Sequence, residues 1–416
     1  MSVYIGIDVG KFFHLAYCLD ERGNRLGTLK FNNDRPGFCE LERLVSKLSI
    51  SDNGNTMLGM EATGHYWLPL YEFLKNKGYQ VKVFNPLKVN RFRDFYIQPL
   101  KTDPKDAFVI ASILMYGKIK PTVLPSEDIQ RLKRIVRYRR FLTEERAQVK
   151  NKIRCMLDEI FPEYQSVPFF SDLFGPTSRA LLKIAPHPEK ILALPQKKWA
   201  EYLFSHSKGR LGYRGAWKKA SLIYEVASSS IGSKVVSSVL EECLKDLLYE
   251  LEHLEDRIGF FTQEIEDRLS LTRGKILTSI PGVGPTTAAT IISEIGDIAQ
   301  FRSPDALVCY CGLIPSSHSS GTFISRRNRM AKRGQSSLAH VFYQIALSSL
   351  RCNSSLREYY EEKLRQGKSK KVAVVAVARK LIRITYSILK NGQLYTDSQR
   401  TKGKELTFLT KEAVSN

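Results

Sequence analysis

The first 120 residues alternate between short apolar runs and polar breaks. Runs at 3–8, 14–19 and 25–31 predict three strands joined by hairpins. A helix is expected over 36–48, because Pro36 suits a first helical turn. Further strands are expected at 56–60 and 80–84, with helices at 68–76 and 106–115. Strands followed by alternating helices and strands predict an α/β domain.

The order of these elements, with three antiparallel strands first, is that of ribonuclease H.

After position 131, and again after 240, apolar residues recur at a spacing of three and four residues. The two apolar seams consist of Leu132, Ile135, Leu142, Val149, Ile153, Met156 and Ile160, with Arg139 and Arg146 in seam positions, and of Leu240, Leu244, Leu247, Leu251, Leu254, Ile258, Phe261 and Ile265. Such heptads predict two coiled-coil arms that pair with each other or with another protomer.

These patterns predict five parts of the chain. They are an α/β domain at 1–125, coiled-coil arms at 126–161 and 234–272, a helical insertion of unknown role at 162–233, a mainly α domain at 273–392 and a flexible tail at 393–416. The insertion is rich in proline, in aromatic residues and in basic pairs such as Lys197-Lys198 and Lys218-Lys219.

Composition and net charge indicate which class of partner the protein binds. The 416 residues are 43% hydrophobic and 25% charged, which is typical of globular proteins and argues against wholesale disorder. The net charge of +22 favours a polyanionic partner, usually nucleic acid, over a merely soluble basic surface. Neither a transmembrane run nor a signal peptide is evident, and the 7 cysteines lack Cys-x-x-Cys spacing. We therefore expect a cytoplasmic protein with reduced thiols and no membrane partner.

Four carboxylates lie at strand ends and at a helix start. Asp8 and Glu61 end apolar strands, and Asp103 and Asp106 lie three residues apart where a helix begins. Hard oxygen ligands suit Mg²⁺ or Mn²⁺, and two such ions can activate an attacking oxygen and stabilise a leaving one. The structural alternative is that Asp103 caps the helix while Asp106 is a solvated loop residue.

A second alternative concerns the first strand. Residues 5–10, Ile-Gly-Ile-Asp-Val-Gly, also resemble the first phosphate loop of actin-like sugar kinases. Those chains usually continue with Thr or Ser, whereas Lys11-Phe12-Phe13 follow here, and a second Asp-x-Gly motif is missing at a suitable distance. The kinase interpretation is therefore the weaker one.

Two motifs in the last third suit phosphate chemistry. Gly282 and Gly284 precede a helical run and resemble a helix-hairpin-helix element, in which backbone N–H groups approach a phosphate; a plain tight turn is the alternative. Ser320 precedes a basic run, and a serine nucleophile needs such cations to neutralise its transition state. That run comprises Arg326, Arg327, Arg329, Lys332 and Arg333. A Ser-Ser-Gly sequence alone is more often a turn, and His318 fits a surface or phosphate-contact residue.

Together these motifs resemble the DEDD insertion-sequence transposases, whose chains contain a RuvC-like N-terminal domain and a C-terminal transposase domain. The shared motifs, in order, are Gly6-Ile7-Asp8, Met60 to Gly64, Asn85-Pro86, Lys101 to Ala107, Ser279 to Gly284, Gly312-Leu313-x-Pro315, Ser320-Gly321 and Lys332-x-Gly334. They cover both ends of the chain. Pilin-gene invertases are relatives of this family.

The resemblance implies roles for individual residues. Asp8, Glu61, Asp103 and Asp106 would be metal ligands, and Ser320 would be the nucleophile that forms a phosphoserine link to DNA. The neighbouring Ser319 is a rival by position alone. The resemblance further implies a coiled coil between two catalytic domains, dimers or tetramers in which one protomer's metal site meets another's serine, a bridge RNA as guide, and a prokaryotic, nucleoid-associated protein.

Three hypotheses follow. The first is a transposase that excises and inserts a mobile element. The second is a junction-resolving nuclease or site-specific invertase in which metal-activated water attacks and Ser320 is structural. The third is a nucleic-acid-binding protein without catalysis.

Overall fold

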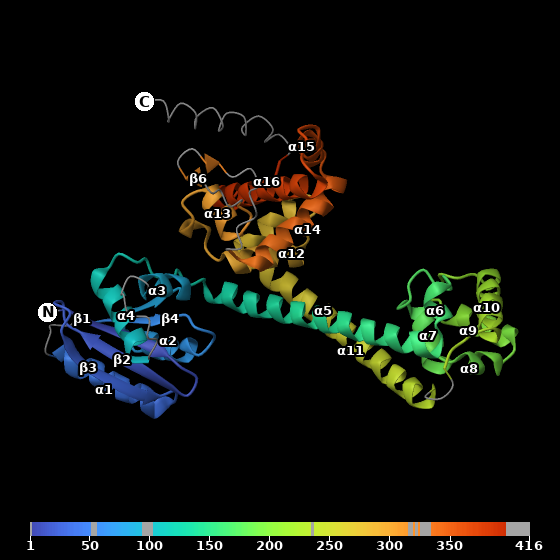
Figure 1. Cartoon of the computed structure of the whole chain (residues 1–416), viewed down its shortest axis with the longest axis horizontal. Coiled ribbons are helices and arrows are strands. Elements are labelled where there is room, and N and C mark those ends of the chain that lie inside the picture. Colours follow the sequence, from blue (N-terminus) through green and yellow to red (C-terminus); the bar gives the residue numbers. More distant parts are fainter. Residues whose placement is uncertain are drawn as a thin grey trace. The chain divides into compact units, whose positions relative to one another are not determined.

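The computed structural model describes residues 2–50, 56–93, 103–233, 237–314, 319–320, 323–324 and 334–396. The chain forms two compact units, Met1–Leu124 and Pro125–Asn416 (Figure 1). Each unit has its own hydrophobic core. Among the described helices, none combines the length and the apolar run needed to cross a membrane.

The first unit is built on a five-stranded mixed sheet with strand order β3-β2-β1-β4-β5. Its strands are β1 (Val3–Val9), β2 (Phe13–Leu19), β3 (Arg25–Asn32), β4 (Thr56–Glu61) and β5 (Val81–Phe84). The first three strands pair antiparallel, whereas β4 runs parallel to β1 and β5 runs parallel to β4. The expectation of three antiparallel strands followed by alternating helix and strand is confirmed, and the sheet is compatible with a RuvC-like α/β domain.

Helices cover both faces of this sheet. On one face, α1 (Arg35–Ile50) and α2 (Trp67–Asn76) share a core with Ile5 and Ile7 of β1. On the other face, α3 (Pro86–Arg93) and α4 (Asp103–Tyr116) form a second, smaller core. Because side chains alternate along a strand, Gly6 and Asp8 of β1 lie on the face of α4.

Two glycines allow α4 to lie directly on the sheet. Gly6 and Gly59 are paired in the register of β1 and β4. A Cβ at Gly6 would come within 2.2 Å of the Ala107 carbonyl oxygen and of the Ala111 backbone nitrogen, and a Cβ at Gly59 would come within 2.9 Å of Leu114. Only hydrogen fits between backbone and backbone at Gly6, so this residue sets how closely α4 approaches β1.

The second unit contains two long paired helices, α5 (Glu127–Ile160) and α11 (Ser237–Ser270). The start of α5 shares a core with the end of α11, and the end of α5 shares another with the start of α11, so the two helices run antiparallel. Of the two pairings that the heptads left open, with each other or with another protomer, the structure describes the arms against each other within this chain. Val136 and Leu157 are also buried in α5, while the expected seam residues Ile135 and Met156 are only partly buried, because a helix of 3.6 residues per turn drifts from a strict heptad.

Arg139 occupies its expected seam position. Its Nε donates a hydrogen bond to Thr262 Oγ1 of α11 at 2.7 Å. Burial first, and then the neighbouring charge of Arg146, lower the pKa of Arg139.

The segment between the arms is helical. Its elements are α6 (Glu163–Ser166), α7 (Pro176–Ile184), α8 (Pro188–Leu192), α9 (Gln196–Ser205) and α10 (Tyr213–Ser228). They pack on the end of α5 and on the first half of α11 around aromatic side chains such as Phe161, Tyr164 and Trp199. Prolines fall in the first turns of α7 and α8, where a missing N–H costs no helical hydrogen bond.

The last third is mainly helical and packs on the other end of the α5–α11 pair. It comprises the 3₁₀ turns η1 (Arg273–Ser279) and η2 (Ile298–Gln300), the helices α12 (Pro285–Ile295), α13 (Pro304–Tyr310), α14 (Ser336–Cys352), α15 (Ser354–Arg365) and α16 (Lys370–Asn391), and the short strands β6 (Ser319–Ser320) and β7 (Phe323–Ile324).

The described residues that precede and follow the Ser320 segment contact each other in this helical body. The backbone N–H of Gln335 donates to the Tyr310 carbonyl oxygen at 2.8 Å. Gly334 has a φ of +129°, and a Cβ there would lie 2.5 Å from the backbone nitrogen of Gly312. The two motif glycines therefore pack backbone against backbone and close the two ends of the segment together.

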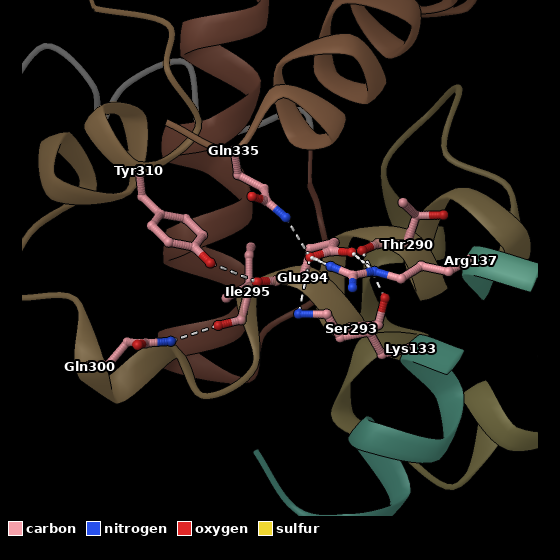
Figure 2. A network of polar contacts seen from close by, with 9 residues as sticks. All are labelled: Lys133, Arg137, Thr290, Ser293, Glu294, Ile295, Gln300, Tyr310 and Gln335. Atoms are coloured by element: carbon pink, nitrogen blue, oxygen red, sulfur yellow. Dashed lines mark hydrogen bonds and ion pairs between the residues drawn. The ribbon is translucent and has the colours of Figure 1, made fainter. Parts of the chain in front are cut away.

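A buried carboxylate joins this closure to α5 (Figure 2). Glu294, at the end of α12, has a side chain that is only 3% exposed. Arg137 donates from Nε and Nη2 to its two carboxylate oxygens at 2.9 and 3.1 Å, and Lys133 Nζ lies 3.1 Å from Oε2. Gln335 Nε2 donates to Oε2 at 2.7 Å, and the Tyr310 hydroxyl donates to the Glu294 carbonyl oxygen at 3.2 Å.

Burial by itself raises the pKa of Glu294, but the hydrogen bonds and charges of Arg137 and Lys133 outweigh it and leave that pKa lowered. A carboxylate whose pKa is lower when folded stabilises the fold above its unfolded pKa and loses that contribution as pH falls. The network therefore holds both ends of the Ser320 segment to the arm at neutral pH.

We expect Gly6→Ala to destabilise the first unit by about 2 kcal/mol or more, because α4 must move to make room for the methyl group. Gly27→Ala in β3 is the matched control, since nothing lies within 4 Å of its Cβ position, and its effect should stay within about 0.5 kcal/mol. Urea unfolding of the two variants measures this difference. Equal midpoints would contradict the close packing of α4.

We expect Glu294→Gln to lower the free energy of unfolding by about 1–3 kcal/mol at pH 7, because charge-assisted hydrogen bonds are lost. The difference from the parent protein should narrow as pH falls below the ordinary glutamate value of 4.5. The control Glu264→Gln removes a half-exposed pair with Arg268 and should cost less than about 0.5 kcal/mol. A pH-independent difference between Glu294→Gln and the parent would rule out the charged network.

Candidate active site

Asp8 and Glu61 lie side by side at the carboxyl ends of two parallel strands. The register pairs Ile7 with Met60, so the next position on each strand carries a carboxylate. Each lies two residues beyond a glycine that faces α4, and both side chains are therefore on the α4 face. Glu61 is half-buried, and its Oε1 accepts a hydrogen bond from Thr63 Oγ1 at 2.6 Å.

Asp106 completes the group from the first turn of α4. It precedes Ala107, the residue whose carbonyl lies against Gly6, and this packing brings Asp106 to the same side of the sheet as Asp8. Its side chain is 8% exposed, and Arg93 Nη2 at the end of α3 lies 2.8 Å from its Oδ1. The interpretation of Asp106 as a solvated loop residue is wrong, because the residue is helical and buried.

The three carboxylates line a single cavity of about 360 Å³. Its wall also includes Arg93, Asn90 and the loop that joins β1 to β2. The complete lining consists of Asp8, Val9, Gly10, Lys11, Phe12, Phe13, Leu15, Glu61, Thr63, Asn90, Arg93 and Asp106. Anionic oxygen donors beside the cations Lys11 and Arg93 suit a phosphodiester held through a divalent cation.

His14 shapes the loop of this cavity. It is fully buried, and its Nδ1 accepts a hydrogen bond from the Gly10 N–H at 3.2 Å. Burial lowers the pKa of His14, against a smaller opposing effect of Asn33, and so favours the neutral imidazole that this hydrogen bond requires. The sequence analysis missed His14 and Arg93. His14 lies in an alternating strand and Arg93 at the basic end of a helix, and neither pattern shows which residues the side chain will contact in the folded protein.

The carboxylates fit a metal by their chemistry but do not form a ready-made cage. Within the described side chains, no group of three or more His, Cys, Asp or Glu converges closely enough to hold a metal ion. One oxygen of Asp106 is engaged by Arg93. Asp103 begins α4, three residues before Asp106, but its side chain lies outside the described residues.

The other expected site residues are described only in part. Ser319 and Ser320 form β6, where the backbone of Ser320 pairs with Phe323 of β7, and their side chains are not described. His318 and the five cations Arg326, Arg327, Arg329, Lys332 and Arg333 lie outside the described residues.

The two glycines before α12 differ in their surroundings. Gly282 has a φ of +92°, and a Cβ there would lie 3.2 Å from Ser349 Oγ of α14, which itself donates to the Pro281 carbonyl oxygen. The positive φ and this close contact together explain the requirement for glycine at position 282 without a ligand. Gly284 immediately precedes α12, Gly284 and Pro285 are exposed, and nothing lies within 4 Å of the Gly284 Cβ position.

Two protein-family models match this chain. A model of IS110-type DEDD transposases, described as Transposase, matches residues 5–162 and contains the three carboxylates. A second model, described as Transposase IS116/IS110/IS902 family, matches residues 274–361 and contains Ser320.

Relatives match over nearly the whole chain. The Insertion element IS116 uncharacterized 44.8 kDa protein of Streptomyces clavuligerus is 26% identical over 95% of this chain and 96% of its own length. The Insertion element IS110 uncharacterized 43.6 kDa protein of Streptomyces coelicolor is 25% identical over 98% of both chains. The Pilin gene-inverting protein of Moraxella bovis is 24% identical over 94% of this chain and 97% of its own. With both ends of the chain matched by models of one family, this protein belongs to the IS110-type insertion-sequence transposases and is a DNA recombinase.

Proposed function

We propose that this protein moves an insertion sequence by cutting and rejoining DNA at a metal-dependent site. The observation that carries the proposal is that Asp8, Glu61 and Asp106 come from three separate elements to line one cavity. Bringing three carboxylates together around one cavity is unfavourable unless a cation compensates their like charges. In DNA strand cleavage, the cation that compensates the carboxylates would also compensate the negative charge of the substrate phosphate.

The residues that would hold the metal are Asp8, Glu61 and Asp106, with Asp103 as a fourth ligand from the same end of α4. The donor set consists of carboxylate oxygens, which suit Mg²⁺ or Mn²⁺. When bound, the cation would supply positive charge to a scissile phosphate. Arg93 holds Asp106 from one side of the cavity, so it orients this carboxylate for its role.

We propose Ser320 as the nucleophile. Its Oγ attacks the phosphorus of a DNA phosphodiester, the hydroxyl proton passes to solvent, and one deoxyribose oxygen leaves and takes up a proton. The phosphoserine bond keeps the energy of the broken phosphodiester, so a deoxyribose hydroxyl of another strand can attack it and release the serine. This sequence needs neither an oxidant nor a nucleotide cofactor.

Several finer assignments rest on the family resemblance. We propose that DNA is contacted by the open start of α12 at Gly284, by the Gly282 turn and by Arg326, Arg327, Arg329, Lys332 and Arg333. We also propose that a bridge RNA guides the reaction and that a dimer or tetramer brings one protomer's Ser320 to another's carboxylates. The functional parts are then 1–125, 126–161 with 234–272, 162–233 and 273–392.

The runner-up is site-specific inversion or junction cleavage in which water attacks in place of serine. Similarity to a pilin gene-inverting protein favours inversion as a possible outcome of the same chemistry. A serine mechanism and a water mechanism differ in one observable, which is a covalent protein–DNA adduct.

We expect Ser320→Ala to abolish this adduct while leaving DNA affinity within about twofold, because only the attacking oxygen is removed. Denaturing electrophoresis of the protein incubated with labelled element ends detects the adduct. The control Ser319→Ala should keep it. An adduct that survives in Ser320→Ala, or that disappears in Ser319→Ala alone, would refute the assignment of the nucleophile.

We expect Asp8→Asn to reduce DNA cleavage about a hundredfold or more, because a charged ligand next to the phosphate is lost. Electron paramagnetic resonance of added Mn²⁺ gives an independent readout, in which Mn²⁺ affinity should fall at least about tenfold. Glu72→Gln, on the exposed side of α2, is the matched control and should change neither quantity. Unchanged Mn²⁺ affinity in Asp8→Asn would remove Asp8 from the metal site.

A further inference from the structure

Apart from Lys219, which donates to the Phe169 carbonyl oxygen, the Lys and Arg residues of the insertion fall into two groups that differ in their partners. The first group faces α11, where each cation meets an acidic side chain. The pairs are Arg179 with Glu255 at 2.8 Å, Lys183 with Glu252 at 2.7 Å, and Lys190 with Glu241. These cations are neutralised within the protein, and they hold the insertion to the arm.

The second group lies on α9, on α10 and on the turn between them. Its members are Lys197, Lys198, Lys208, Arg210, Arg214 and Lys218, and all six are exposed. In the part of the chain that the structure describes, none of them forms an ion pair. Glu201 is the one acidic residue between positions 196 and 219. This surface therefore presents unneutralised positive charge that no internal contact explains.

Three exposed aromatic rings lie among these cations. Phe204 is 47% exposed, Tyr213 45% and Trp217 41%. The rings of Phe204 and Tyr213 meet edge to face with centroids 6.0 Å apart. Tyr213 and Trp217 are one turn apart on α10, and so they share a face of the helix.

The same helix places its cations in a parallel row. Arg214 and Lys218 are also one turn apart, each next in sequence to an aromatic residue of the first row. The buried side of α10, which adjoins the aromatic row, packs into the insertion through Ala216, Ala220 and Ile223. We name the exposed side, formed by Phe204, Tyr213, Trp217 and the six cations, the α9–α10 surface.

The rings of this surface are not needed by the core. Trp199 on α9 shows what a structural tryptophan looks like here, since it is 4% exposed and its Nε1 donates to the Ile191 carbonyl oxygen at 2.7 Å. The three surface rings are ten times more exposed. Aromatic faces bordered by unpaired cations are the features with which proteins bind single-stranded nucleic acid, because bases stack on the rings while phosphates meet the cations.

We propose that the α9–α10 surface binds an unpaired segment of a DNA strand. Bases stack on Tyr213 and Trp217, and the backbone follows Arg210, Arg214 and Lys218. DNA is the partner because exchange of strands between duplexes, the activity of this family, requires base pairs to open. The surface consists wholly of insertion residues and does not involve Ser320 or the carboxylates of the first unit.

Fluorescence anisotropy of a labelled 20-nucleotide single-stranded DNA tests the proposal with the full chain. Trp217→Ala should weaken binding about tenfold, and Trp217→Phe should retain most of the affinity, because a phenyl ring still stacks. Arg214→Ala should lower the slope of affinity against salt concentration by about one. Tyr249→Ala on α11 is the control, a 61% exposed ring next to Glu250, and it should bind as the parent does.

A second readout needs no label. Trp67 and Trp199 are buried, so quenching of tryptophan fluorescence by the oligonucleotide should come from Trp217 and should vanish in Trp217→Phe. If Trp217→Ala weakened the binding of duplex DNA as much as that of single-stranded DNA, the ring would not act by stacking on unpaired bases, and the proposal would be overturned. A higher affinity for RNA of the same sequence than for the DNA would overturn the choice of DNA as the partner. Unchanged affinity for single-stranded DNA in Trp217→Ala would exclude this surface as a binding site.

Discussion

The contact between α4 and the backbone at Gly6 determines the geometry of the carboxylate cavity. Hydrogen is the only substituent that leaves room for the Ala107 carbonyl, and Gly59 provides the same clearance on the next strand. Because α4 lies this close, Asp106 in its first turn reaches the ends of β1 and β4, where Asp8 and Glu61 lie. A larger residue at position 6 would lift the helix and move one carboxylate away from the other two.

The second unit uses a buried charge for a related purpose. Glu294 accepts hydrogen bonds or ion pairs from two cations of α5 and from Gln335, which follows the segment containing Ser320. Tyr310, which precedes that segment, donates to the backbone of the same residue. A buried carboxylate without these partners would be costly, so the network favours one arrangement in which both ends of the segment are held to the arm. The directional hydrogen bonds of this network therefore specify how the two ends of the segment are positioned on the arm, whereas an apolar contact would allow them to shift.

The positive charge of the chain has more than one role. Part of it is internal and holds the insertion to α11 through pairs such as Arg179 with Glu255. Part of it is unpaired on the α9–α10 surface, where exposed rings accompany it. Net charge alone indicates a polyanionic partner, but only the pairing pattern separates cations that stabilise the fold from those available to nucleic acid.

The local order of elements was readable from the sequence, because alternation in strands and heptads in helices are imposed by burial of one face. The same patterns placed Asp8 and Glu61 at strand ends and predicted the two arms. Which residues come together was decided by tertiary structure. Arg93 reaches Asp106, and Glu294 reaches Arg137, across distances in sequence that no periodicity encodes, and the partners exist only once the helices have packed. Gly6 shows the link between the two levels, since it was visible in a motif, but its reason is the backbone of α4 that lies against it.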